Sequence, residues 1–62
     1  MLNGTKVELI TDLTKYGDGL VVGIQGIVCD PTTMWSRMGA VGVVFTNGIQ
    51  LDVFPKSLKV ID

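Results

Sequence analysis

Residues 40–54 read AVGVVFTNGIQLDVF, in which two apolar runs lie on either side of the dipeptide Asn47-Gly48. Asn-Gly between apolar runs is a strong local signal for a β-hairpin, because both residues tolerate the backbone conformations that tight hairpin turns require. The stretch therefore predicts two antiparallel strands, at residues 40–45 and 49–54.

The register of this hairpin follows from the requirement that one of its faces be buried. A two-residue turn at Asn47-Gly48 would place Phe45 on the same face as Gln50, which mixes apolar and polar side chains. A three-residue loop, with Gly48 left-handed in a β-bulge, gives one wholly apolar face, so we predict the bulged turn. The residue pairs that this loop predicts are Phe45–Ile49, Val43–Leu51 and Val41–Val53.

The chain before the hairpin also reads as strands. Glycines occur at intervals too short for helices, and β-branched residues dominate between them. We expect a first strand at residues 6–10, a polar loop at 11–19, and a second strand at 20–30. A bulge or bend near Gln25-Gly26 is expected to switch the buried face of the second strand, since glycines within strands often mark such bends.

After the hairpin, Pro55 cannot continue a central strand because it has no backbone N–H. A single helical turn that starts at Pro55 would tuck Leu58 under the sheet. Residues 59–61 then form a short closing strand. The sequence thus predicts a single all-β domain over residues 1–62, with five strands and a short 3-10 turn before the last one.

Four stretches resemble a known fold, and they are Val7-x-Leu9, residues 23–28 (GIQGIV), residues 43–45 and residues 58–60. Together with the spacing of the loops, they resemble the SH3-like small β-barrel superfamily. The G-x-x-G-x-V element resembles the glycine-bent strand of KOW-type domains of ribosomal and transcription-elongation proteins. The overall spacing is similar to the small SH3-like barrel protein of photosystem I and to the variable subunit of ferredoxin–thioredoxin reductase. The resemblance implies a five-stranded SH3-like barrel, without fixing a family within the superfamily.

Composition narrows the classes of function. The 62 residues contain no histidine, so the commonest general base is absent, and Cys29 is the only cysteine. One thiol cannot form an internal disulfide or complete a four-ligand zinc site. No spacing places two carboxylates together, and no phosphate-binding loop is present. We therefore expect a non-enzymatic protein with no catalytic residues, no metal and no cofactor.

Charge and hydropathy bear on partners and location. The net charge is −1 and the isoelectric point is about 5.0, whereas proteins that bind nucleic acids through phosphate contacts usually carry a basic face. Apolar runs are far shorter than the ~20 residues needed to span a bilayer. The lone cysteine favours a reducing compartment. We expect a soluble, cytoplasmic protein without membrane contact, for which nucleic-acid binding is disfavoured by charge.

Residues 31–39, PTTMWSRMG, form the most unusual segment of the chain. Trp, Arg and Met are enriched at protein interfaces. In this hypothesis Trp35 anchors a protein partner and Arg37 pairs with a carboxylate of that partner. Tyr16 is expected nearby, because the first and second loops of SH3-like barrels flank one groove. The candidate partner-binding residues are Tyr16, Met34, Trp35, Arg37 and Met38.

Three functions remain open at this stage. The first is a protein-binding module or small accessory subunit that acts through residues 31–39. The second is a nucleic-acid-associated, KOW-like barrel that uses Lys15, Tyr16, Trp35 and Arg37 for stacking and phosphate contact. The third is a homo-oligomer whose site forms between protomers, as in the small plasmid dihydrofolate reductases that the chain distantly resembles. Apolar side chains outside the hairpin, with Val44 near Gln50 and Ala40 near Phe54, favour this third function. Trp35 has a structural alternative, which is to cap an open end of the barrel together with the methionines.

Overall fold

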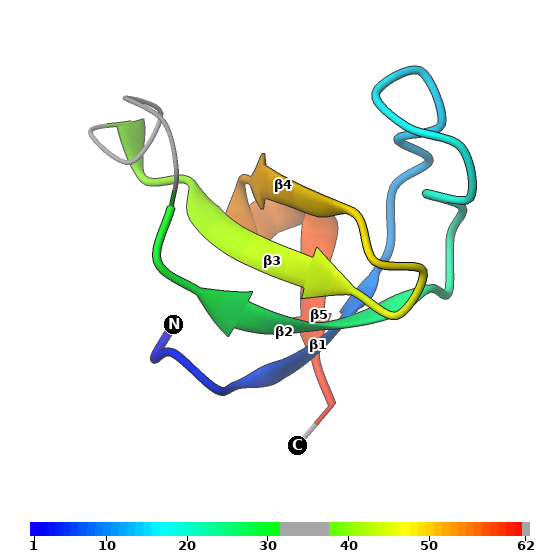
Figure 1. Ribbon diagram of the computed structural model, residues 1–62. Helices are drawn as coiled ribbons and strands as arrows, with labels where there is room; N and C mark the ends of the chain where they lie inside the picture. The colour runs from blue at the N-terminus through cyan, green and yellow to red at the C-terminus, as the bar shows by residue number, and fades with distance from the viewer. Residues whose placement is uncertain (32–37, 62) are drawn as a thin grey trace.

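The computed structural model describes residues 1–31 and 38–61, which form one antiparallel sheet of five strands (Figure 1). The strands are β1 (Lys6–Leu9), β2 (Gln25–Cys29), β3 (Val41–Phe45), β4 (Gln50–Val53) and β5 (Leu58–Val60), and the 3-10 turn η2 (Pro55–Ser57) precedes β5. Their order in the sheet is β4-β3-β2-β1-β5. The all-β class and the 3-10 turn before the last strand are confirmed. The barrel is not confirmed, because β4 and β5 are the two edges of the sheet and no ladder joins them in the described part of the chain.

The predicted register of the β3–β4 hairpin is confirmed. Gly48 has a φ of +89°, and its N–H donates to the carbonyl of Phe45 at 2.9 Å. The N–H of Phe45 donates in turn to the carbonyl of Ile49 at 2.8 Å. The remaining pairs of the apolar face are Val41–Val53 and Val43–Leu51. The left-handed glycine and the bulge therefore place the predicted side chains on the inner face of the sheet.

The same bulge occurs at two further corners of the sheet. In each, the N–H of a left-handed glycine donates to the carbonyl of a buried residue on the neighbouring segment. That buried residue donates its own N–H to the carbonyl of the residue after the glycine. The glycines and their buried partners are Gly4 with Val28, Gly23 with Leu9 and Gly48 with Phe45. Because bulges bend the chain and increase its twist, the three together curl the sheet around its inner face.

The second strand begins at Gln25, so the expected strand at residues 20–30 is wrong in its first half. The residues before Gln25 form a turn, in which the N–H of Ile24 donates to the carbonyl of Val21 at 3.2 Å. Leu20 is buried, whereas Val22 is exposed, so these two residues do not share a face as an extended strand would require. The bulge at Gly23 lies two residues before the expected bend, and this bulge is where the ladder with β1 begins.

The core lies on the inner face of the curled sheet. Its buried hydrophobic cluster contains Val7, Leu9, Leu20, Val28, Val43, Phe45, Val53 and Leu58. Leu58 is buried after a 3-10 turn that starts at Pro55, as the sequence predicts. Leu20 reaches the core from the segment between β1 and β2, so this segment covers part of the inner face of the sheet.

The loop between β1 and β2 is tied to the β3–β4 turn by Asn47. The Nδ2 of Asn47 donates to the carbonyl of Asp18 at 3.1 Å, and its Oδ1 accepts from the N–H of Ile49 at 3.1 Å. Near the start of the loop, the N–H of Thr14 donates to the Asp12 carboxylate at 2.9 Å and lowers the pKa of that carboxyl. These contacts fix the direction that the loop takes across the molecule.

Replacing Gly48 with L-alanine is expected to lower the free energy of unfolding by about 1–2 kcal/mol, the cost of a left-handed backbone for an L-residue. Apart from the two adjacent residues, no heavy atom of the described residues lies within 4 Å of the position that a Cβ would take, so the cost comes from φ and not from crowding. Urea denaturation measures the loss. Chemical synthesis with D-alanine at this position provides the control, because a D-residue prefers a positive φ. If D-alanine costs as much as L-alanine, the handedness of the backbone is not the cause.

Candidate functional site

The structure describes two of the five residues predicted to bind a partner. Met34, Trp35 and Arg37 lie outside the described residues, so their part in the predicted site stays a prediction. Met38 and Tyr16 are 66% and 60% exposed. Both are therefore available at the surface of the described chain.

Tyr16 and Met38 are not brought together. Tyr16 belongs to the loop that the bond between Asn47 and Asp18 ties to the hairpin turn, at the carboxyl end of β3. Met38 comes just before the other end of β3, and Figure 1 shows the two segments at opposite ends of this strand. The Nζ of Lys15 lies 5.0 Å from the centre of the Tyr16 ring, so one face of this ring is covered by its neighbour.

A surface that the sequence did not single out lies on the outer face of the sheet. Lys6 on β1 pairs with Ile27 on β2, and Ile27 pairs with Val44 on β3. The N–H of Ile61 donates to the carbonyl of Lys6 at 3.0 Å, which places Ile61 beside Lys6 at the end of the same row. Ile27 and Val44 are each 41% exposed and Ile61 is 39% exposed. We call Ile27, Val44 and Ile61 the outer row.

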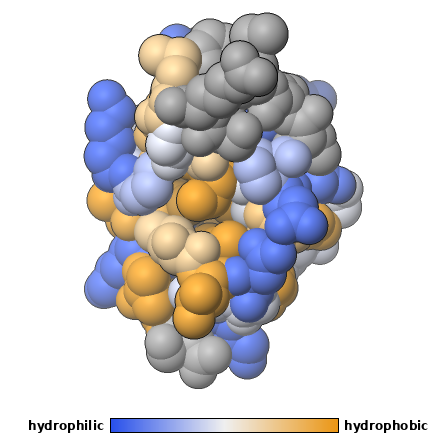
Figure 2. Space-filling view, turned by 90° about the vertical axis from the view of Figure 1, so that its left-hand side faces the viewer, coloured by the Kyte–Doolittle hydropathy of each residue, from blue (hydrophilic) through white to orange (hydrophobic). Residues whose placement is uncertain are grey.

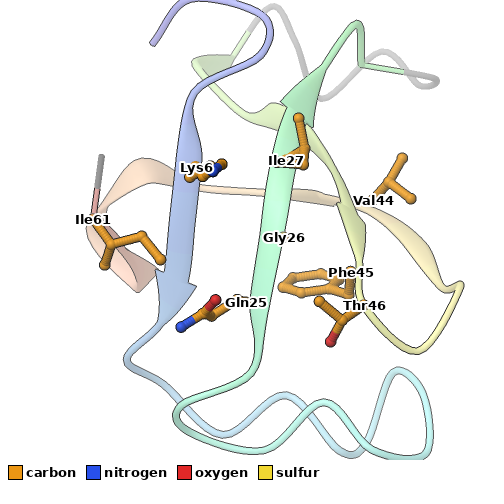
Figure 3. Close-up of a pocket in the computed structure, with 8 residues that line it drawn as sticks. All are labelled: Lys6, Gln25, Gly26, Ile27, Val44, Phe45, Thr46 and Ile61. Atoms are coloured by element: carbon orange, nitrogen blue, oxygen red, sulfur yellow. The ribbon is translucent and has the colours of Figure 1, made fainter.

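The outer row borders a shallow groove of about 500 Å³ (Figure 3). Ile27 and Val44 lie side by side on adjacent strands, whereas Ile61 lies on the far side of β1. The other residues that line the groove are Lys6, Gln25, Gly26, Phe45 and Thr46. Figure 2 shows that hydrophobic side chains gather on one face of the molecule between hydrophilic ones. The groove can therefore offer aliphatic contact with amine, amide and hydroxyl groups at its border.

Two apolar doublets in the sequence are the signal for this surface. Ile27-Val28 and Val43-Val44 each place one side chain on either face of a strand, because successive side chains alternate. Val28 and Val43 are buried in the core, so their neighbours Ile27 and Val44 must face outward. Which outward residues become neighbours depends on the pairing of β2 with β3, which no local pattern specifies.

The expected exposed pair of Ala40 and Phe54 is wrong for Ala40. Ala40 is buried, whereas Phe54 is partly exposed at the end of β4. The pairing of Val44 with Gln50 is confirmed. The Nε2 of Gln50 donates to the Sγ of Cys29 at 3.6 Å, and Cys29 is half-buried. The outer surface of the hairpin is thus polar at β4 and apolar at β3.

Residues 1–31 and 38–61 contain no group of three His, Cys, Asp or Glu side chains that could hold a metal ion. In the same ranges, no helix has the length and apolar character needed to cross a membrane. No protein-family model matches the chain, and no match was found among curated proteins or solved structures.

Proposed function

We propose that this chain is a non-enzymatic protein-binding module, acting as a small accessory subunit through residues 31–39 and the adjoining outer face of β2 and β3. The observation that carries the proposal is the outer row, in which three aliphatic side chains about 40% exposed line one groove. Ile27 and Val44 are neighbours on adjacent strands, and Lys6 lies between them and Ile61. Exposed apolar side chains that gather at one groove favour an interaction site, whereas scattered ones are ordinary.

The two parts of the proposed surface belong to the same pair of strands. Residues 31–39 follow β2 and precede β3, and these strands carry Ile27 and Val44. Met38, just before β3, is also exposed. The Trp and Arg in the same segment are the residue types that most often supply binding energy at interfaces. Gln25 and Thr46 supply polar groups at the groove of the kind that surround interface cores, and Lys6 adds an amine within the row.

We place the fold in the SH3-like small-barrel class. The strand order, with β5 beside β1 and a consecutive β1-β2-β3-β4 meander, supports this placement, as does the 3-10 turn before β5. A cytoplasmic location is part of the proposal. The presence of one unpaired cysteine, Cys29, supports it, because free thiols persist in reducing compartments.

A homo-oligomer whose site forms between protomers is the second candidate, and the outer row favours it equally. A second copy of the chain would present the same aliphatic side chains, so the row can be buried by self-association. The two candidates differ in what covers the row. For the nucleic-acid-associated alternative, the only described aromatic ring named for stacking is Tyr16, and Lys15 covers one of its faces.

The substitution Val44→Lys is expected to abolish binding through the outer row while leaving the fold intact. A lysine there puts a charge into the groove, and exposed substitutions usually change stability by no more than about 0.5 kcal/mol. Val22→Lys is the matched control, since Val22 is an exposed valine outside the groove. Affinity purification should recover a partner with the wild-type chain and Val22→Lys. The partner should be lost, or bound at least about tenfold more weakly, with Val44→Lys and with Trp35→Ala.

Light scattering over a range of concentrations separates the two candidates. A monomeric mass supports the accessory subunit if Val44→Lys and Trp35→Ala lose the partner while Val22→Lys keeps it. An oligomer that Val44→Lys dissociates and Val22→Lys does not supports the second candidate. Binding of a fluorescent oligonucleotide that weakens steeply with salt would replace both with the nucleic-acid alternative. The proposed surface would be overturned if the chain is a monomer and Val44→Lys and Val22→Lys recover the same partners equally well.

A further inference from the structure

The chain contains two Asn-Gly dipeptides, Asn3-Gly4 and Asn47-Gly48, and each glycine is the left-handed residue of a bulge. Each asparagine also ties two distant segments together. The Nδ2 of Asn3 donates to the Oδ1 of Asp30 at 2.7 Å. The Nδ2 of Asn47 donates to the carbonyl of Asp18 at 3.1 Å. The same dipeptide therefore serves twice as a turn and as a tie.

An asparagine followed by glycine can lose its side-chain amide without an enzyme, because glycine has no Cβ to hinder the approach of its own backbone nitrogen. The deprotonated glycine nitrogen attacks Cγ, a new C–N bond forms, the Cγ–Nδ2 bond breaks, and ammonia leaves. Water then opens the resulting succinimide at either carbonyl and gives aspartate or isoaspartate. The net reaction consumes one water, releases one ammonia and involves no oxidation.

The native turn opposes this reaction at Asn47. The attacking N–H of Gly48 is engaged by the carbonyl of Phe45 at 2.9 Å. The Oδ1 of Asn47 is held by the N–H of Ile49, and its Nδ2 is held by the carbonyl of Asp18, each at 3.1 Å. Bringing Cγ onto the Gly48 nitrogen must break all three bonds together. The Asn47 side chain is thus held at both ends of its amide.

Asn3 provides an internal comparison. The N–H of Gly4 donates to the carbonyl of Val28 at 2.8 Å, so the attacking nitrogen is engaged there as well. The amide of Asn3 is held only through Nδ2, by Asp30, and its Oδ1 accepts no hydrogen bond within the described residues. Reaction at Asn3 therefore requires fewer bonds to break than reaction at Asn47.

We propose that Asn47 is a spontaneous deamidation site that the native turn protects, and that its conversion releases the loop between β1 and β2 from the hairpin. The carboxylate of the product has no N–H to donate to the Asp18 carbonyl, and it places a negative charge beside that oxygen. Isoaspartate also adds a methylene to the backbone of a turn whose length sets the register of β3 and β4. Either product breaks the tie.

Intact-mass and peptide-map analysis at pH 8 and 37 °C tests the protection. The native protein is incubated beside a sample unfolded in urea, and each conversion adds about one dalton. In urea, Asn3 and Asn47 should convert at comparable rates, since both precede glycine. In the native protein, Asn47 should convert at least about tenfold more slowly than in urea, and more slowly than Asn3. Conversion of native Asn47 at the urea rate, or ahead of Asn3, overturns the proposal.

Hydrogen exchange of Asn47→Asp, with Asn3→Asp as the matched control, tests the release of the loop. The N–H groups of Leu13 and Leu20 report on the loop, because each donates to a carbonyl within it. Their exchange should accelerate about three- to tenfold in Asn47→Asp, the factor that one hydrogen bond represents, and remain unchanged in Asn3→Asp. Unchanged exchange in a folded Asn47→Asp protein, or equal acceleration in both variants, overturns the release.

Discussion

Replacing Gly42 with alanine should remove a large share of the free energy of unfolding. A Cβ at this position would lie 2.5 Å from the carbonyl oxygen of Asp30 and 2.9 Å from that of Cys29. These are backbone atoms that no rotamer change can move. Gly42 pairs with Cys29 on one side and with Asp52 on the other, so β3 cannot shift without disturbing two ladders. We expect a loss of about 3 kcal/mol, the upper end of ordinary overpacking.

That loss compares with a total free energy of unfolding of about 3–9 kcal/mol for 62 residues. Far-UV circular dichroism and urea titration measure it. Gly17→Ala is the matched control, because its Cβ would meet the side-chain tips of Ile49 at 3.0 Å and Leu20 at 3.2 Å, which can move aside. The control should lose less than about 1 kcal/mol. A Gly42→Ala protein as stable as Gly17→Ala would mean that β2 and β3 do not approach as described.

Phe45→Ala should lower the free energy of unfolding by a similar amount, but through removal of a buried side chain instead of crowding by an added one. Phe45 is the largest of the fully buried side chains and is 2% exposed. Its ring lies over Gly26, where Cδ1 would be 3.2 Å from an added Cβ, so residue 26 has no side chain that could fill the space if the ring is removed. Truncation of a buried Phe to Ala costs about 3–5 kcal/mol, because apolar contacts are lost and a cavity remains.

Val44→Ala is the control for Phe45→Ala, since the adjacent residue points to the outer face of the same strand. It should cost about 1 kcal/mol or less in the same urea titration. A large difference between the two variants is the expected result. Equal losses would show that the inner and outer faces of β3 are not those described, and both the core and the outer row would have to be reassigned.

The β3–β4 hairpin was predictable because its information is local. The turn residues Asn47-Gly48 and the alternation of Val43 and Phe45 lie within one short stretch, and they allow only one register with an apolar face. The second strand was not predicted as well. Leu20 and Val22 have the alternation of a strand, but the left-handed conformation of Gly23 turns the chain before the ladder with β1 begins.

The candidate site depended on contacts between distant parts of the chain. The outer row exists because β5, β1, β2 and β3 pair in one register, which no single stretch of sequence encodes. Tyr16 was expected beside residues 31–39, of which Met38 is described. The loop that carries Tyr16 is bound to the hairpin turn at the other end of β3 from Met38. Residue types could suggest an interface, whereas their arrangement required the pairing of the strands. The roles of Trp35 and Arg37 stay predictions.

The pairing of β5 with β1 also determines when each strand can join during folding. A local hairpin such as β3–β4 closes within about 1–10 μs. Leu9 and Leu58 pair across most of the length of the chain. Closing so long a loop costs conformational entropy before the contacts that stabilise it can form. We therefore expect β5 to dock last and to limit the folding rate. Until it docks, β1 is an unpaired sheet edge that the β5 of another copy can occupy. Refolding at high protein concentration therefore favours exchange of β5 between molecules.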